Sequence, residues 1–130
     1  MEWVIVFDDE FYPEYKRLPI EVQDELLATS SWLERFGPQT GRPWVDTLKG
    51  SHFANMKELR FDAADGIWRV AFAFDPKRRA ILLMAGDKSG ISEKKFYKNL
   101  IEKADLRYAR HLTKLNDADQ NLNRVKGDER

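Results

Sequence analysis

The stretch ANMKELRFDAADGIWRVAFAFDPKRRAILLMAGD, residues 54–87, decides the fold. It contains three runs of strand-like sequence, at 54–62, 67–75 and 80–87, separated by the short segments AADG and PKRR. An Asp-Gly pair between two alternating runs is a strong signal for a hairpin turn. The third run is nearly all apolar, which is typical of a central strand. The sequence therefore predicts three consecutive antiparallel strands.

The residues before this meander predict one strand and a helical hairpin. EWVIVF, residues 2–7, is short, β-branched and aromatic and predicts a strand. Two helical stretches follow at about 9–17 and 20–36, and Gly37-Pro38 ends the second. Residues 37–46 are rich in glycine and proline and predict a loop, followed by a short extended or turn segment, LKG, at 48–50.

The residues after the meander predict one helix and a tail. Over 92–115, apolar residues recur at helical spacing, and Ser92 is a suitable N-cap. Residues 116–130 lack apolar periodicity and predict a flexible tail, so we expect a single domain over 1–115. The order strand, helix, helix, three strands, helix indicates an α+β fold: a small antiparallel sheet with the helical hairpin and the C-terminal helix packed on one face.

Charge is balanced in total but not along the chain. The protein has 22 basic and 22 acidic residues and no cysteine. Residues 1–41 carry a net charge of −6, residues 42–114 carry +7, and residues 115–130 carry −1. The basic part can attract a polyanion, or the two parts are ordinary solvated faces. The acidic N-terminus is neither a signal peptide nor a membrane span, so we expect a cytoplasmic protein without membrane contact.

Several chemistries lack support in the sequence. The histidines, His52 and His111, are far apart and have no metal-ligand spacing, so we expect neither metal nor cofactor. His52 can act in acid–base chemistry or only cap a turn, whereas His111 fits a surface or packing role. GDKSG, residues 86–90, lacks the spacing of a nucleotide-binding loop, and no nucleophile elbow is present. We expect the glycines of this segment to turn the chain from the last strand into the last helix.

The remaining candidates are basic. Alternation along 54–62 places Lys57 on a core-like face with Leu59 and Phe61, and places Arg60 on the open face with Glu58.

In the next strand, Arg69 shares its face with Ala71 and Ala73, and an arginine among small neighbours is a candidate anion ligand. The alternative is an ordinary cross-strand ion pair between Glu58 and either Arg69 or Arg60.

Lys88, after the last strand, and Tyr97, in the last helix, can converge with Arg60 and Arg69 on one phosphate. Such a set can cleave RNA without histidine or metal. The 2′-hydroxyl attacks its own phosphodiester, the cations stabilise the developing charge, and a tyrosine or a lysine moves protons.

The segments LKG, KELRF, WRVAF, ILLMAGDKSG and KKFY, in this order, resemble the phage-derived branch of the RelE/HigB family of toxins from type II toxin–antitoxin modules. The resemblance covers about residues 1–114. It implies a RelE-like fold and a ribosome-dependent, metal-independent endoribonuclease that cuts mRNA and inhibits translation. It also implies three partners: the ribosome, mRNA and a cognate antitoxin, expected to be a helix-turn-helix DNA-binding protein.

Carried over by motif, the catalytic roles fall on Arg60, Arg69, Lys88 and Tyr97, with Arg69 in WRV as the firmest transfer. Lys57 is the alternative to Arg60, and Lys94 or Lys95 can substitute for Lys88. The expected RNA-binding residues are Lys49, Lys57, Lys94, Lys95 and Lys98.

Two other functions stay open. A ParE-like branch of the same family poisons DNA gyrase, and a non-catalytic binding or regulatory relic is also compatible with the fold. An acidic, partly disordered antitoxin segment suits the basic face or a wedge beneath the terminal helix, and the sequence does not choose between these surfaces.

Overall fold

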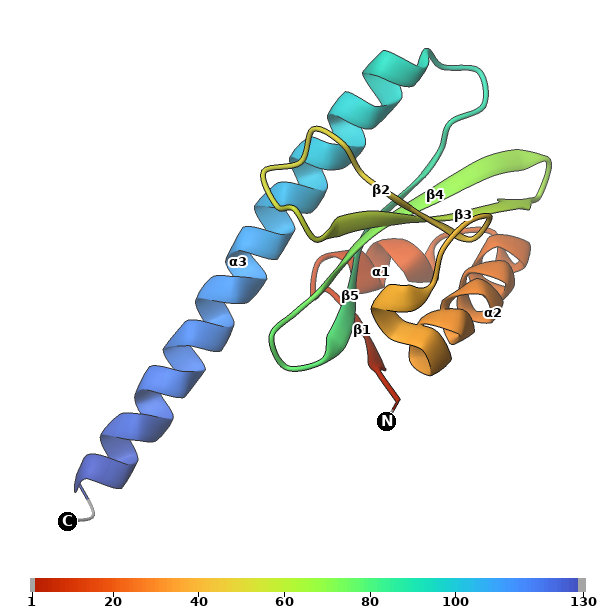
Figure 1. Ribbon diagram of the computed structural model, residues 1–130. Helices are drawn as coiled ribbons and strands as arrows, with labels where there is room; N and C mark the ends of the chain where they lie inside the picture. The colour runs from red at the N-terminus through yellow and green to blue at the C-terminus, as the bar shows by residue number, and fades with distance from the viewer. Residues whose placement is uncertain (1, 129–130) are drawn as a thin grey trace.

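A computed structural model describes residues 2–128, with side chains described up to residue 122. Five strands form one sheet in the order β1-β5-β4-β3-β2 (Figure 1). The predicted meander is confirmed as three long antiparallel strands. The turn after β3 has Ala64 and Asp65 at positive φ, as a two-residue hairpin requires. The strands are β1 (Val4–Phe7), β2 (Val45–Thr47), β3 (Met56–Ala63), β4 (Gly66–Phe74) and β5 (Arg79–Asp87).

The sheet differs from the prediction at both edges. β1 pairs with β5 in parallel, so the expected all-antiparallel sheet is wrong at this pairing. A parallel pair needs a long crossover, and the helices and strands between β1 and β5 supply it. At the other edge, part of the predicted loop forms the short strand β2. This strand pairs with β3, with Val45 opposite Leu59, and adds a fifth strand to the sheet.

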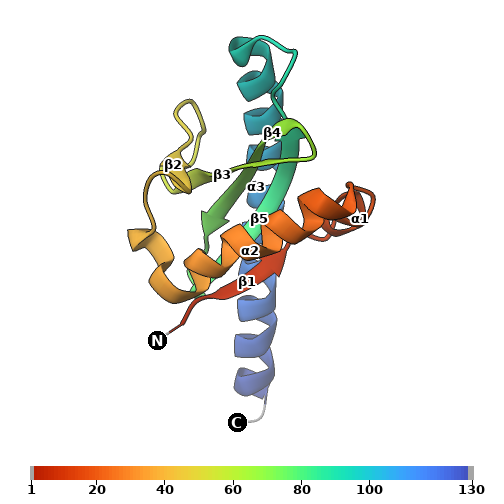
Figure 2. The ribbon, with the colours of Figure 1, turned by 90° about the vertical axis from the view of Figure 1, so that its right-hand side faces the viewer.

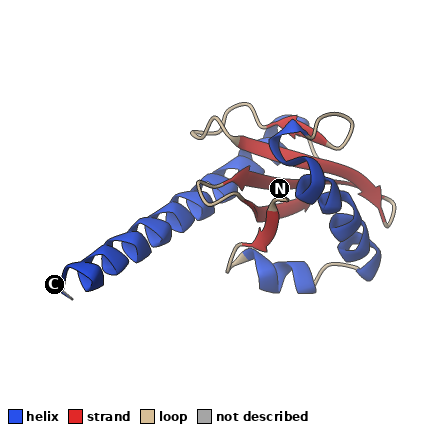
Figure 3. Ribbon diagram, turned by 60° about the horizontal axis from the view of Figure 1, so that its bottom comes forward, coloured by secondary structure: helices blue, strands red, loops and turns tan. Residues whose placement is uncertain are grey.

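The helices are α1 (Phe11–Lys16), α2 (Ile20–Phe36), the 3-10 turn η1 (Gly37–Gln39) and α3 (Glu93–Asp128). The predicted helical hairpin is confirmed, and α2 ends at Phe36 with Gly37, whose φ is 54°, as its C-cap. The predicted helix end at 115 is wrong, because α3 continues to Asp128 and projects beyond the sheet (Figures 1 and 3). The domain boundary at 115 and the flexibility of the tail stay predictions.

The helices cover both faces of the sheet, not one as predicted (Figure 2). Side chains alternate along β4. Val70 and Phe72 pack in a cluster with α1 and α2, which we call the α2 face. Ala71 and Ala73 pack under α3 on the opposite side, which we call the α3 face. Among the described residues, no helix is long and apolar enough to cross a membrane.

Candidate active site

Three polar side chains form a connected cluster on the α3 face. Arg69 Nε lies 3.1 Å from Glu58 Oε1, and each side chain is only 7% exposed. The Tyr97 hydroxyl donates a hydrogen bond to the same Oε1 at 2.8 Å. Arg69 Nη1 also donates to the Trp68 carbonyl at 2.8 Å. The structure therefore contains the Glu58–Arg69 ion pair that the sequence left as an alternative to an anion site.

Strand register and a glycine explain why these groups meet. Glu58 lies opposite Ala71, and Arg60 lies opposite Arg69, so Glu58 and Arg69 are diagonal neighbours on one face. The helix approaches this face closely because β5 has a glycine at position 86. A Cβ there would lie 2.9 Å from the ring of Phe96. Tyr97 follows Phe96 and is thereby brought over Glu58.

Burial raises the pKa of both acids in the cluster. Desolvation raises the pKa of Glu58 above its ordinary value, although the Tyr97 hydrogen bond and the charge of Arg69 oppose this. Desolvation and the Glu58 carboxylate raise the pKa of Tyr97, which therefore keeps its proton at neutral pH. A buried carboxyl beside a fixed arginine has the character of a general base, whose pKa must lie nearer to neutral than that of an exposed acid.

Arg69 retains hydrogen-bonding capacity within the cluster. Its Nε–H is buried but is not aligned for a hydrogen bond with Glu58, so the contact between them is ionic. A buried donor without an acceptor costs free energy, which an incoming anion can recover. Arg69 is thus suited to hold a phosphate oxygen.

The other two predicted catalytic residues lie at the border of the cluster. Lys88 Nζ is 5.9 Å from the centre of the Tyr97 ring and 2.9 Å from Glu93 Oε1. This contact lowers the pKa of Glu93. Arg60 Nη1 lies 3.8 Å from Asp46 Oδ2, and it lines a small cavity together with Arg69. The structure therefore brings all four predicted catalytic residues to one region of the sheet.

The predicted RNA-binding lysines divide into two groups. Lys49, Lys94 and Lys98 line one groove with Tyr97. Lys57 shares the face of Leu59, as the alternation predicted, and its Nζ lies 3.5 Å from Thr47 Oγ1, away from Arg69. Lys95 is exposed and does not line the groove. An RNA-binding role stays a prediction for all five lysines.

The central position of Glu58 in this cluster was not predicted from the sequence. Alternation placed it on the face of Arg60, so it was considered only as an ion-pair partner. One feature of the sequence could have indicated it: Glu58 and Arg69 lie on the same face of neighbouring predicted strands. A helix that covers this face buries both side chains. The raised pKa of Glu58 results from its burial, which the sequence does not show directly.

Neither histidine joins the cluster. His111 Nε2 contacts Asp75 Oδ2 at 2.9 Å and packs on Tyr108, which fits the predicted packing role. His52 is exposed and lines the groove, and its backbone N–H donates to Asp105 at 3.0 Å. Among the side chains described, those of residues 2–122, no three from His, Asp or Glu are grouped so as to hold a metal ion.

The fold and this cluster define a RelE-like α+β protein with a basic, tyrosine-containing site between sheet and terminal helix. Its fold is similar to that of a mutant of the E. coli toxin RelE in the free state, with a TM-score of 0.58 and 13% identity. The match covers 79% of this chain and 97% of RelE. Residues 13–109 match the family described as "Phage derived protein Gp49-like". The chain belongs to this family, which confirms the resemblance to the phage-derived branch of the RelE/HigB group.

Two proteins of Mycobacterium tuberculosis, each named as a candidate toxin, are close in sequence. HigB2 is 42% identical over 98 residues, which are 75% of this chain and 48% of HigB2. HigB3 is 55% identical over 75 residues, which are 58% of this chain and 63% of HigB3. The chain thus spans about half to two thirds of the length of these relatives.

Proposed function

We propose that the chain is the toxin of a type II toxin–antitoxin module and acts as an endoribonuclease on mRNA in the ribosome. The observation that carries this proposal is the buried Glu58–Arg69–Tyr97 cluster with Lys88 beside it. The family and the names of HigB2 and HigB3 support the toxin assignment. A cognate antitoxin neutralises the protein in this proposal.

The cluster supplies the groups that RNA cleavage needs. Glu58 accepts the proton of the 2′-hydroxyl, whose oxygen attacks the adjacent phosphorus. Arg69 stabilises the negative charge that develops on the phosphoryl oxygens. Tyr97 or Lys88 donates a proton to the 5′-oxygen as its bond to phosphorus breaks. The products are a 2′,3′-cyclic phosphate and a 5′-hydroxyl, and no step in this scheme requires a metal ion.

Access to the site requires a change in two contacts. Arg69 and Glu58 are almost fully covered in the free chain, so a phosphate must replace part of the Glu58–Arg69 contact. The Lys88–Glu93 pair is the easier contact to open, because Glu93 is 74% exposed. Its opening frees Lys88 for the phosphate. A ribosome that presents strained mRNA to the site is consistent with this need.

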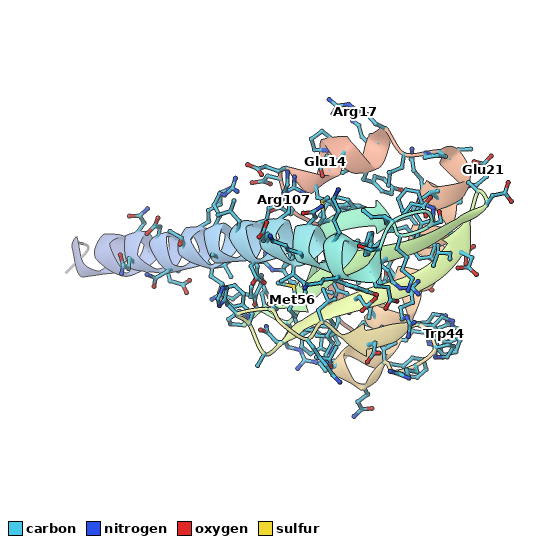
Figure 4. All side chains as sticks on the ribbon, turned by 90° about the horizontal axis from the view of Figure 1, so that it is seen from above. Glu14, Arg17, Glu21, Trp44, Met56 and Arg107 are labelled. Atoms are coloured by element: carbon cyan, nitrogen blue, oxygen red, sulfur yellow. The ribbon has the colours of Figure 1, made fainter. Side chains whose placement is uncertain are left out.

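The experiment is expression of Arg69→Ala and Tyr97→Phe variants, with growth measured and RNA 5′ ends mapped. We expect Arg69→Ala to slow cleavage by about 100- to 1,000-fold, the loss seen when one charge-stabilising donor is removed. Tyr97→Phe removes the proton and the hydrogen bond to Glu58 and is expected to abolish growth inhibition. Arg17→Ala is the control, because Arg17 is exposed at the end of α1 (Figure 4).

Each result has a definite meaning. New RNA 5′ ends with the unaltered chain and with Arg17→Ala, but not with the two site variants, support the proposal. Full toxicity of both site variants would show that the site is wrong. Intact mRNA with DNA-damage signalling would identify a gyrase poison, and absence of growth inhibition in cells without antitoxin would identify a non-catalytic relic.

A further inference from the structure

A groove runs along α3 from the candidate active site toward the middle of the helix. It has a volume of about 710 Å³ and lies between the loop 49–53 and α3. Its upper end contains Tyr97, the residue that donates to Glu58, so groove and active site share a wall. An occupant of the groove would therefore cover the Tyr97 side of the active site.

The two ends of the groove differ in chemistry. Lys49, Lys94 and Lys98 make the end near Tyr97 basic. Further along, the lining is mostly apolar, with Ile101, Leu106 and Ala109, and it also contains His52, Glu102 and Asp105. Leu106 is 63% exposed, although most leucines on this side of the protein are covered. Leu106, Ile101 and Ala109 lie together in this concave surface, and a contiguous apolar patch of this kind suits the apolar side of a partner.

The groove is held in shape by contacts between its walls. Ser51 Oγ lies 2.5 Å from Asp105 Oδ1, and the His52 backbone N–H donates to Asp105 Oδ2 at 3.0 Å. Phe53 packs edge-to-face on Tyr108 with ring centres 4.9 Å apart. Asp105 and Tyr108 are both buried in α3. The loop is thus fixed on the helix, and a partner can bind without first ordering it.

RNA does not suit the apolar half of the groove. A phosphate placed against Leu106, Ile101 and Ala109 would lose water to apolar atoms and would lie in the part of the groove that carries the Glu102 carboxylate, which repels it. An amphipathic helix suits both halves, since its apolar face covers Leu106 and its acidic residues meet the lysines. A β-strand is less suitable, because the groove is lined by a helix and a loop and offers no free strand edge.

We propose that the antitoxin inserts an acidic, amphipathic helix into this groove and thereby competes with RNA for Lys49, Lys94 and Lys98. This inference rests on the proposed toxin function, from which the partner is taken. It identifies the docking surface that the sequence left open. Neutralisation then occurs by occupation of the path to the active site and requires no displacement of α3.

The test is the affinity of the purified chain for its purified antitoxin, which is the protein whose co-expression restores growth. Leu106→Asp is expected to weaken binding by at least about tenfold, because the apolar contact is lost and the new charge repels an acidic helix. Leu122→Asp is the matched control. Leu122 is 55% exposed on the same helix but lies outside the groove, so binding is expected to be unchanged.

A second readout separates this inference from the proposed function. Leu106→Asp should still cut mRNA and inhibit growth, and the antitoxin should no longer rescue the cells. Unchanged affinity of Leu106→Asp overturns the docking site, even if RNA is cut as proposed. Loss of RNA cleavage by folded Leu106→Asp shows that the apolar half serves RNA, which also overturns it.

Two further results complete the test. If the unaltered chain leaves mRNA intact but binds its antitoxin, and Leu106→Asp weakens that binding, the proposed nuclease is overturned and the docking site stays in place. If Leu106→Asp does not fold, Leu106→Ala gives the same comparison without the added charge, and unchanged affinity of Leu106→Ala then overturns the site.

Discussion

The two faces of the sheet bury different kinds of side chain. On the α2 face, Phe72 and Leu82 of the sheet pack against Leu26 and Leu33 of α2 in an apolar cluster. On the α3 face, the apolar contacts are interrupted by charge. Glu58, Arg69, Asp75, Asp105 and Arg107 are all buried and either lie in α3 or contact this side of the sheet.

This difference indicates that the buried charges of the α3 face have a role other than stability. Apolar burial is the main source of folding free energy, whereas a buried ion pair seldom adds stability over an apolar replacement. The charges of the α3 face instead fix the position of α3. In Figure 4, Arg107 lies on the side of α3 that faces Glu14 of α1. Arg107 Nη2 is 2.5 Å from Glu14 Oε2. Apolar burial on both faces stabilises the protein, and the α3 face in addition positions charged groups.

The largest expected effect is on the α2 face. Phe72 is fully buried, so Phe72→Ala should lower the free energy of unfolding by about 3–5 kcal/mol through lost burial and a cavity. On the α3 face, the double variant Glu58→Met with Arg69→Met should leave this free energy unchanged or raise it by about 1–4 kcal/mol. Urea unfolding measures both changes.

Two controls make this comparison specific. Phe36→Ala removes an equal side chain that is 47% exposed, and it should cost much less than Phe72→Ala. The double variant should be inactive on RNA although it is stable. If it is instead destabilised as strongly as Phe72→Ala, the Glu58–Arg69 pair contributes to folding and its role is not separate from stability.

Local sequence features predicted the parts of the fold that depend on neighbouring residues. The hairpin at residues 63–66, the end of α2 with Gly37 as its C-cap, and the alternation that separated Lys57 from Arg69 are confirmed. Each depends on a turn, a cap or a period of two, which are visible within a few residues.

Two of the errors concern contacts between distant residues. The parallel pairing of Val4 with Arg79 depends on where the chain comes back to β1 after the helices and strands in between. No pattern of neighbouring residues predicts this. In the sequence, Ala71 and Ala73 are only small neighbours of Arg69. In the structure, α3 packs on these two alanines, which explains their small size. The same packing buries Glu58, and this explains why its importance was not visible in the sequence.

A smaller effect should appear in the pH dependence of stability, with opposite signs for two buried carboxyls. Burial raises the pKa of Glu58. Its contribution to stability is therefore fully present below the unfolded pKa of 4.5 and is lost as pH rises through the folded value. Burial acts in the same direction on Asp75, but hydrogen bonds from His111 and Arg79 prevail and lower its pKa. Its contribution is present above 3.8 and is lost as the solution is acidified.

Urea unfolding at a series of pH values checks both signs. Relative to the unaltered protein, Glu58→Gln should gain stability as pH rises above 4.5, because glutamine does not titrate. Asp75→Asn should gain stability relative to the unaltered protein as pH falls below 3.8. Curves that change in the same direction for both variants would mean that Glu58 is not held in a desolvated site.

The smallest expected effect lies where α3 leaves the sheet. Lys77 Nζ, in the turn between β4 and β5, is 3.3 Å from Asp119 Oδ1, and both side chains are about half exposed. An exposed pair contributes about 0–1 kcal/mol, and alanine is a better helix former than aspartate by up to about 0.7 kcal/mol. Asp119→Ala should therefore change the free energy of unfolding by less than about 1 kcal/mol, in either direction. Asp119→Asn isolates the charge, because its shape is the same. A loss above about 2 kcal/mol for both variants, measured by urea unfolding, would show that the extension of α3 docks on the body through more than this pair, and this extension would then also stabilise the fold.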